Sequence, residues 1–273
     1  TDCPELAYIK WDDNAITANY GSTYLGSDRQ SQIYTGYHLA LRKVLERIRA
    51  KYPDLVIQGC ASGGGRVNYG LLPYFDEFWT SDNTDALQRV YIQWGTSQFF
   101  PANAMAAHVS AAPNHQTQRT IPLKFRFDVG EAGRLGIEMR PSDFTTKQLA
   151  FAQQAVEDYK RLRPVIQLGD LYRLLSPYEQ GGVAASHMYV SADKGKAVVY
   201  AYKLKHFVGH TVPPIRMQGL DPNRSYRIKE LNKVGNSITA DGKLISGKVL
   251  MEAGLALALD NEYASRMVEL TAE

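Results

Sequence analysis

The first part of the chain alternates between the apolar spacing of strands and that of helices. Leu6 to Trp11 is apolar, β-branched and aromatic, which predicts a strand, and it runs directly into charged and amide residues. Apolar residues at helical spacing then predict an amphipathic helix that stops at Pro53: Ile33, Tyr37, Leu41, Val44 and Ile48. Leu55 to Ile57 is typical of a short buried strand, and a glycine-rich turn follows at Cys60 to Arg66. This order predicts a βαβ unit.

The alternation of strands and helices continues as far as Pro164. Further strands are expected at 77–79, 104–110 and 135–139, and further helices at 86–94, 123–129 and 145–162. Pro164 is expected to stop the last of these helices. Because polar residues stand at the carboxyl ends of the predicted strands, the pattern favours a parallel barrel or an open parallel sheet.

The pattern of apolar residues changes after Pro164. Short apolar segments at hairpin intervals predict strands at 187–190, 197–203, 226–231 and 248–251, with turns at 192–195 and 240–242. We therefore expect two domains, a barrel portion over residues 1–164 and an antiparallel β-sandwich domain over residues 165–273. The histidines of the second domain, His187, His206 and His210, are interpreted as ordinary β-domain residues.

Composition excludes some classes of protein. A net charge of only +3 without a basic run argues against nucleic-acid binding. No apolar run approaches the length of a membrane span. The two cysteines, Cys3 and Cys60, are too few to frame a disulfide-stapled fold. The many aromatic residues suit a protein that handles sugars, and they suit a tyrosine-rich core equally well.

The first predicted strand ends in candidate chemistry. Alternation along a strand places Tyr8, Lys10 and Asp12 on one side, and Asp13 on the other. Lys10 beside Asp12 would keep that carboxylate ionised, which suits a nucleophile or a charge stabiliser. An ordinary surface ion pair at a strand end is the alternative.

A second carboxylate, Asp82, follows a later apolar strand. If both strands belong to one barrel, Asp12 and Asp82 converge on one pocket. Two carboxyl groups in different environments can cleave a glycosidic bond, since one attacks while the other protonates the leaving oxygen. Trp79 and Phe78 are expected to give Asp82 the apolar surroundings that would keep it protonated.

Three motifs carry a resemblance to a known family. Tyr8 to Asn14, Cys60 to Arg66 and Trp79 to Asp85 resemble, in order and spacing, the K-W-D-x-N, C-x-S-G-G-G-R and W-x-S-D-x-T-D motifs of the α-galactosidases of glycoside hydrolase family 36. The resemblance implies a retaining α-galactosidase that hydrolyses terminal α-D-galactosyl residues of oligosaccharides such as melibiose and raffinose. It implies no cofactor and no metal.

The resemblance also implies roles for single residues. Asp12 would be the nucleophile and Asp82 the acid/base, with Asp82 preferred over Asp85. Galactose in the −1 subsite would be bound by a set of residues in the three motifs: Lys10, Asn14, Cys60, Gly63, Arg66, Trp79 and Asp85. Within this set, Arg66 is expected to brace the glycine loop and Asp85 to orient its own loop. Asp13 departs from the family, which has an apolar residue there, but it points away from the predicted pocket.

The family further implies that this chain is a C-terminal portion. Its members carry a large N-terminal β domain and a complete (β/α)8 TIM barrel before a small β domain, whereas the first strand here resembles the fourth barrel strand. We expect about five βα units, and a polypeptide that is unstable and inactive alone because open barrel edges are exposed. The full-length parent is expected to be a homo-oligomer, either cytoplasmic or periplasmic in a bacterium.

Several alternatives remain at this point. An α-N-acetylgalactosaminidase or a raffinose-synthase-like galactosyltransferase could use the same fold, while the glycine loop argues against an α-glucosidase. A Mg²⁺ or Ca²⁺ site built from Asp12, Asp13, Asp82 and Asp85 is disfavoured, because Lys10 would compete for the same space. A non-catalytic sugar-binding fragment is the last alternative.

Overall fold

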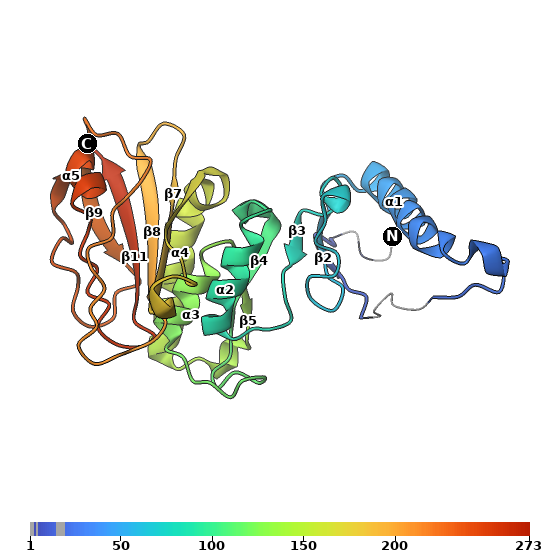
Figure 1. Ribbon diagram of the computed structural model, residues 1–273, viewed down its shortest axis with the longest axis horizontal. Helices are drawn as coiled ribbons and strands as arrows, with labels where there is room; N and C mark the ends of the chain where they lie inside the picture. Colours follow the sequence, from blue (N-terminus) through green and yellow to red (C-terminus); the bar gives the residue numbers. More distant parts are fainter. Residues whose placement is uncertain (1–2, 4, 15–19) are drawn as a thin grey trace. The chain divides into compact units, whose positions relative to one another are not determined.

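The computed structural model describes residues 3, 5–14 and 20–273, which belong to two compact units that divide after Asp82 (Figure 1). The regular elements of the first unit are three strands and one long helix, with single-turn helices at Ser27–Arg29 and Tyr69–Leu71: β1 (Tyr8–Trp11), α1 (Gln32–Lys51), β2 (Val56–Gly59) and β3 (Glu77–Trp79). The three strands run parallel, as predicted.

Helix α1 covers one side of this small sheet. Its buried residues are Leu41 and Leu45, which belong to the predicted apolar stripe or lie beside it. Near its end, Arg49 donates hydrogen bonds to the carbonyl oxygen of Tyr74 (2.8 and 2.6 Å) and pairs with Asp76 (2.5 Å). The carboxyl end of the helix therefore anchors the loops at the amino ends of β2 and β3.

The second unit contains two further barrel strands and the C-terminal sheet. Its barrel elements are α2 (Ala86–Thr96), β4 (Met105–Ser110), α3 (Leu123–Gly130), β5 (Arg134–Glu138) and α4 (Thr146–Leu168). Its later elements are β6 (Asp170–Leu175), β7 (Ala184–Val190), β8 (Lys196–Lys203), β9 (Ser225–Leu231), β10 (Leu244–Ser246), α5 (Gly247–Glu252) and β11 (Ser265–Ala272). Strands β4 and β5 are parallel, and the six later strands form an antiparallel sheet in the order β10-β9-β11-β8-β7-β6.

The central strands of the antiparallel sheet, β7, β8 and β11, are largely buried on both faces. On one face α4 lies along β7 and β8 (Figure 1) and α3 packs against β11, and side chains such as Tyr200, Tyr202 and Phe125 fill this contact. The opposite face packs under irregular segments and α5, with Met217, Leu250 and other apolar residues between them. The predicted fold class is confirmed: five parallel strands that alternate with helices, as in a partial (β/α)8 barrel, precede an antiparallel β domain.

Two local predictions are wrong. The segment 248–251 was expected to be a strand but belongs to helix α5, because the Ser246 side chain accepts a hydrogen bond from the backbone N–H of Val249 and caps a helix there. Helix α4 continues past Pro164 to Leu168, since Val165 and Ile166 are buried in the core beneath it. A Thr145–Gln148 capping box starts that helix.

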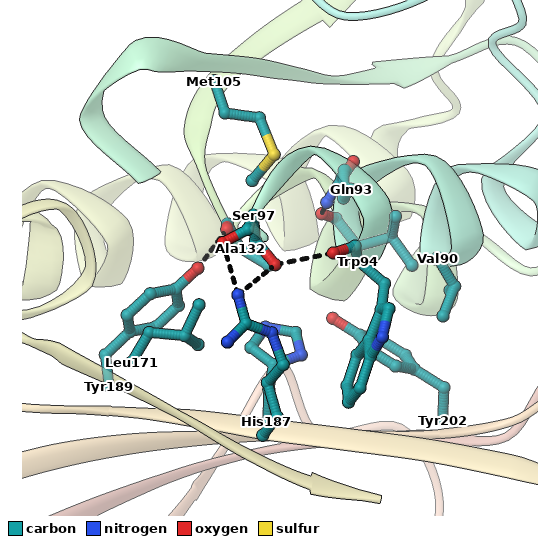
Figure 2. A pocket seen from close by; sticks show the side chains of 12 residues that line it. Val90, Gln93, Trp94, Ser97, Met105, Ala132, Leu171, His187, Tyr189 and Tyr202 are labelled. Carbon is teal, nitrogen blue, oxygen red and sulfur yellow. Dashed lines mark hydrogen bonds between the residues drawn. The ribbon is translucent and has the colours of Figure 1, made fainter. Parts of the chain in front are cut away.

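A small cavity of about 20 Å³ lies inside the second unit, between α2 and the strands β6 and β7 (Figure 2). Gln93, Arg173 and His187 bring polar groups to it, and among the described residues Gln93 Oε1 and Arg173 Nε have no hydrogen-bond partner. Burial, together with the charge of Arg173, lowers the pKa of His187 to about 3. His187 is therefore a neutral interior residue near pH 7.

No helix in the described ranges is both long enough and apolar enough to cross a membrane.

Candidate active site

The polar residues of β1, β2 and β3 gather on one face of the first unit. In the parallel register Lys10 lies opposite Gln58, and Gln58 lies opposite Glu77, so these side chains share one side of the sheet. Glu77 accepts hydrogen bonds from the hydroxyl of Tyr8 (2.6 Å) and from Gln58 (2.7 Å). The result is a polar row that crosses the three strands, while Asp12 and Asp82 lie beyond the carboxyl ends of β1 and β3.

Asp12 is exposed just past the end of β1 and is surrounded by hydrogen-bond donors. A hydrogen bond from the Cys60 side chain lowers the pKa of Asp12, and partial burial opposes this effect. The N–H of Asp13 (2.8 Å), the charge of Lys10 and the amide of Asn14 also lower the pKa of Asp12. The carboxylate is therefore ionised near neutral pH, as a nucleophile requires.

Cys60 is fully buried beneath this carboxylate. Burial and, second to it, the hydrogen bond to Asp12 raise the pKa of its thiol to about 11, against a hydrogen bond from the backbone of Gly63 that lowers it. Near neutral pH, Cys60 is therefore a protonated donor rather than a thiolate nucleophile.

The glycine loop brings backbone close to Asp82. Gly63 has a φ of +80°, and a Cβ there would lie 2.8 Å from the backbone nitrogen of Asp82. Only glycine permits both this conformation and this approach. The loop thereby joins the carboxyl ends of β2 and β3.

Arg66 braces the same loop, as predicted from the sequence. Its side chain is buried, and Nη1 donates to the carbonyl oxygens of Trp11 (3.0 Å) and Cys60 (2.5 Å), at the ends of β1 and β2. Nη2 pairs with Asp13 Oδ2 at 3.3 Å, and Tyr37 of α1 also donates to Asp13. Asp13 therefore faces α1 and Arg66, which is the side away from Asp12 that strand alternation predicts.

Asp82 is exposed, and Trp79 supplies a polar contact rather than apolar cover. The indole Nε1–H donates to Asp82 Oδ1 at 2.9 Å. Phe78 points to the opposite face, where it meets Phe75. The predicted apolar surroundings of Asp82 are therefore wrong, because the edge of Trp79 that reaches this carboxyl group carries the N–H.

A closed series of contacts joins the two carboxyl groups. Asp12 bonds to Cys60, Cys60 bonds to Gly63, and Gly63 packs on the backbone of Asp82. Asp82 bonds to Trp79, and the ammonium of Lys10 lies 3.8 Å from the centre of the Trp79 ring. Lys10 in turn acts through its charge on Asp12. The first unit thus brings together six of the predicted site residues, with Asn14 and Arg66 bonded at their edge.

Asp85 lies in the second unit and has a structural role there. It is fully buried at the N-cap of α2, where it accepts a hydrogen bond from the N–H of Gln88 (3.0 Å). Its other oxygen accepts from Thr117 (2.5 Å) and pairs with Arg119 (2.6 Å). These bonds occupy the carboxylate, so orientation of the loop is the role that the structure describes for Asp85.

Two residues of the polar row, Gln58 and Glu77, were not among the predicted site residues. Both are buried, and both lie on the same face as Lys10. The sequence held one signal for this polar row, a glutamate in the otherwise apolar strand Glu77 to Trp79, because a buried carboxylate requires hydrogen-bond partners.

Two protein-family models match the chain. The model described as Melibiase matches residues 2–169. The model described as the C-terminal domain of glycosyl hydrolase family 36 matches residues 184–270.

The chain is also similar to curated proteins and to solved structures. It is 40% identical to alpha-galactosidase C of Emericella nidulans, over 97% of this chain and 32% of that protein. A crystal structure of a variant of alpha-galactosidase AgaA from Geobacillus stearothermophilus in complex with raffinose matches with a TM-score of 0.88 and 37% identity, over 98% of this chain and 36% of that chain. The crystal structure of the alpha-galactosidase from Lactobacillus brevis matches with a TM-score of 0.90 and 33% identity, over 100% of this chain and 36% of that chain. The chain spans about a third of the length of these relatives.

Proposed function

Because the chain belongs to glycoside hydrolase family 36, we propose that it supplies the two reacting carboxyl groups of a retaining α-galactosidase. The observation that carries the proposal is the closed series of contacts that joins Asp12 to Asp82. Each carboxyl group has its own hydrogen-bond donor, Cys60 for the first and Trp79 for the second. Both are exposed at the carboxyl ends of parallel strands, where barrel enzymes hold their reacting groups.

The proposed reaction has two steps. Asp12 attacks the anomeric carbon of a terminal α-galactosyl unit, while Asp82 gives its proton to the departing glycosidic oxygen. Asp82 then takes a proton from water, and the water oxygen displaces Asp12 to release galactose with retained configuration. This mechanism expects the two carboxyl groups to lie about 5–5.5 Å apart.

The proposed substrates are α-galactoside oligosaccharides of the raffinose and melibiose type. The relative from Geobacillus stearothermophilus was solved with raffinose and, in another variant, with stachyose. In our proposal the galactose hydroxyls contact Lys10, Asn14, Cys60 and the backbone of Gly63, which surround Asp12. The boundary after residue 164 and the homo-oligomeric state of the full-length parent stay predictions.

Separate Asp12→Ala and Asp82→Ala changes test the assignment in the longest gene product that carries this chain. Each should lower the rate on an aryl α-galactoside by several orders of magnitude. Asp54→Ala is a matched control, because Asp54 is exposed at the amino end of β2, away from Asp12. Azide should rescue the Asp12 variant and yield a β-galactosyl azide. Near-normal turnover by the Asp12 variant would refute the nucleophile assignment.

The reaction product distinguishes a hydrolase from a galactosyltransferase. Release of free galactose from raffinose, unchanged by an added sugar acceptor, supports the hydrolase. Transfer to the acceptor as the main product favours the galactosyltransferase, since the two reactions differ in which molecule meets the covalent intermediate. We expect the 273-residue chain alone to show no hydrolysis.

A further inference from the structure

Trp79 lies between the two charged groups of the first unit. Its indole Nε1–H points at Asp82 Oδ1 at 2.9 Å. The face of its ring carries the Lys10 ammonium, 3.8 Å from the ring centre. The Lys10 ammonium therefore contacts the Trp79 ring, and the edge of that ring contacts the Asp82 carboxyl group.

This arrangement leaves Trp79 little surface for a sugar. An aromatic residue that stacks on a sugar needs an open ring face, and Trp79 is only 8% exposed. The Lys10 ammonium covers part of the ring face, and Asp82 occupies the one hydrogen-bond donor of the indole. A direct platform for galactose is therefore a poor description of this side chain.

The hydrogen bond has a definite effect on Asp82. An oxygen that accepts from the indole N–H is turned toward the ring, so the proton of the acid form resides on the other oxygen, Oδ2. When that proton leaves, charge spreads over both oxygens, and hydrogen bonds to charged groups are stronger than those to neutral ones. The indole bond therefore strengthens while Asp82 protonates a leaving group, which is the condition for lowering the barrier rather than only binding substrate.

Lys10 contributes through the ring. A cation over the face of an indole draws electron density toward itself and makes the N–H a better donor. The same ammonium acts by charge on Asp12. One side chain thus influences both carboxyl groups, Asp12 directly and Asp82 through Trp79.

We propose that Trp79 is a positioning residue for the acid/base: it fixes Asp82 Oδ1 so that Oδ2 delivers the proton, and Lys10 strengthens its hold. The proposal rests on the proposed function, in which Asp82 protonates the glycosidic oxygen as the bond to the anomeric carbon breaks and the bond to Asp12 forms. Trp79 itself neither gives nor takes a proton.

A Trp79→Phe variant of the longest gene product that carries this chain tests the proposal, because phenylalanine keeps a ring under Lys10 but lacks the N–H. The ratio kcat/KM reports the first step, in which the glycosidic bond breaks, whereas kcat also includes the second step, in which Asp82 takes a proton from water. Loss of a hydrogen bond to a charged group corresponds to a fall in kcat/KM of about 10- to 100-fold for melibiose, whose leaving group needs a proton. For a 2,4-dinitrophenyl α-galactoside, whose leaving group needs none, kcat/KM should stay within about threefold of the parent value. A fall in kcat/KM of equal size for both substrates would instead make Trp79 a sugar platform and overturn the proposal.

Trp94→Phe is the matched control. Trp94 also has a cation near its ring, Arg173 at 5.9 Å, but it lies on α2 in the second unit. It should show no dependence on the leaving group. If Trp94→Phe reproduces the leaving-group dependence of Trp79→Phe, the effect does not come from the bond to Asp82 and the proposal is wrong.

A spectroscopic readout separates failure of this proposal from failure of the proposed function. In ¹⁵N-labelled parent protein, the indole N–H resonance of Trp79 should lie downfield of its position in Asp82→Ala, which removes the acceptor. This measurement needs neither activity nor a folded Trp79→Phe variant. A downfield resonance in a protein without α-galactosidase activity would keep the Trp79–Asp82 bond and reject the proposed function. A resonance that is the same in both proteins would reject the bond.

Discussion

The molecule places carboxyl groups in two opposite environments. In the first unit Asp12 and Asp82 are exposed at strand ends, where Cys60, Asn14 and the N–H of Asp13 donate to Asp12 and Trp79 donates to Asp82. In the second unit Asp128 and Glu131 are fully buried on and just after α3, where it packs against the antiparallel sheet. The hydrogen bond from Cys60 lowers the pKa of Asp12, whereas burial and the neighbouring charge of Asp128 raise the pKa of Glu131 well above its ordinary value.

This contrast shows that surroundings, not residue type, decide what a carboxyl group does. Asp128 accepts hydrogen bonds from Lys124 (2.6 Å), Asn232 (2.8 Å) and Ser265 (2.6 Å), so it joins α3 to the end of β9 and to β11. Glu131 shares Asn232 at 3.0 Å. The buried pair links α3 to the antiparallel sheet, while the exposed pair is open to solvent.

Asp128→Ala should give the largest change in stability. It removes the acceptor of three donors, two of them buried, and leaves the Lys124 ammonium without its carboxylate, which corresponds to a loss of about 3–5 kcal/mol in the free energy of unfolding. Denaturant-induced unfolding followed by circular dichroism measures it. Asp54→Ala, at an exposed turn, is the control and should change stability by no more than about 0.5 kcal/mol. Equal losses of stability in Asp128→Ala and Asp54→Ala would contradict the contrast between buried and exposed carboxyl groups.

Glu131→Gln should remove a pH dependence. Folded Glu131 binds its proton more tightly than the unfolded chain does, so its contribution to stability is complete below the ordinary pKa of 4.5 and is lost as pH rises toward the raised pKa. The glutamine variant should therefore lose less stability than the parent between pH 4.5 and neutral pH. Melting temperatures across this range test it, with Glu157→Gln on the exposed face of α4 as the control.

The rate at which the Cys60 thiol is alkylated tests its hydrogen bond to Asp12. Because its pKa is raised to about 11, and the bond to Asp12 is one cause, alkylation by iodoacetamide should be slow near pH 8 and should accelerate toward pH 11. Asp12→Asn should make alkylation faster at a given pH. Mass spectrometry distinguishes Cys60 from Cys3, which is exposed and serves as the internal reference. An unchanged rate in Asp12→Asn would argue against the bond between Asp12 and Cys60.

Asp12→Asn should have the smallest effect on folding. The side chain is exposed, so we expect the free energy of unfolding to change by no more than about 0.5 kcal/mol. Denaturant unfolding beside Asp128→Ala gives the contrast directly. A large loss of stability would mean that Asp12 belongs to the framework of the first unit rather than to a reactive surface.

Much of the barrel portion was predictable because its elements follow the two apolar periods. The stripe that includes Leu41 and the helical pattern of residues 145–162 both marked helices that are present. Strands β6, β10 and β11 were not predicted. The leucines of Leu171 to Leu175 continue the helical pattern before them, and β11 contains Glu269, whose burial depends on Arg161 of α4 at 2.6 Å. A sequence does not show a partner that lies 108 residues away.

The candidate site was predictable to the extent that its residues stand in motifs. Strand alternation correctly separated Asp12 from Asp13, because the period of two is a property of the backbone. The environment of Asp82 was not predictable, since Trp79 offers either an apolar face or an N–H, and only packing decides which one meets the carboxyl group. The burial of Asp128 and Glu131 depends on contacts with β9 and β11, which follow about a hundred residues later.

The three glycines after Ser62 limit how the glycine loop between β2 and β3 can be redesigned. An added Cβ at Gly63, Gly64 or Gly65 would meet a backbone atom at 2.8, 2.8 or 2.6 Å, so each position rejects every side chain. A mutant library aimed at a new sugar preference should therefore leave these codons fixed. Ser62 has a φ of +44°, at which β-branched and bulky residues are strained, so the diversity belongs at the half-buried Ala61.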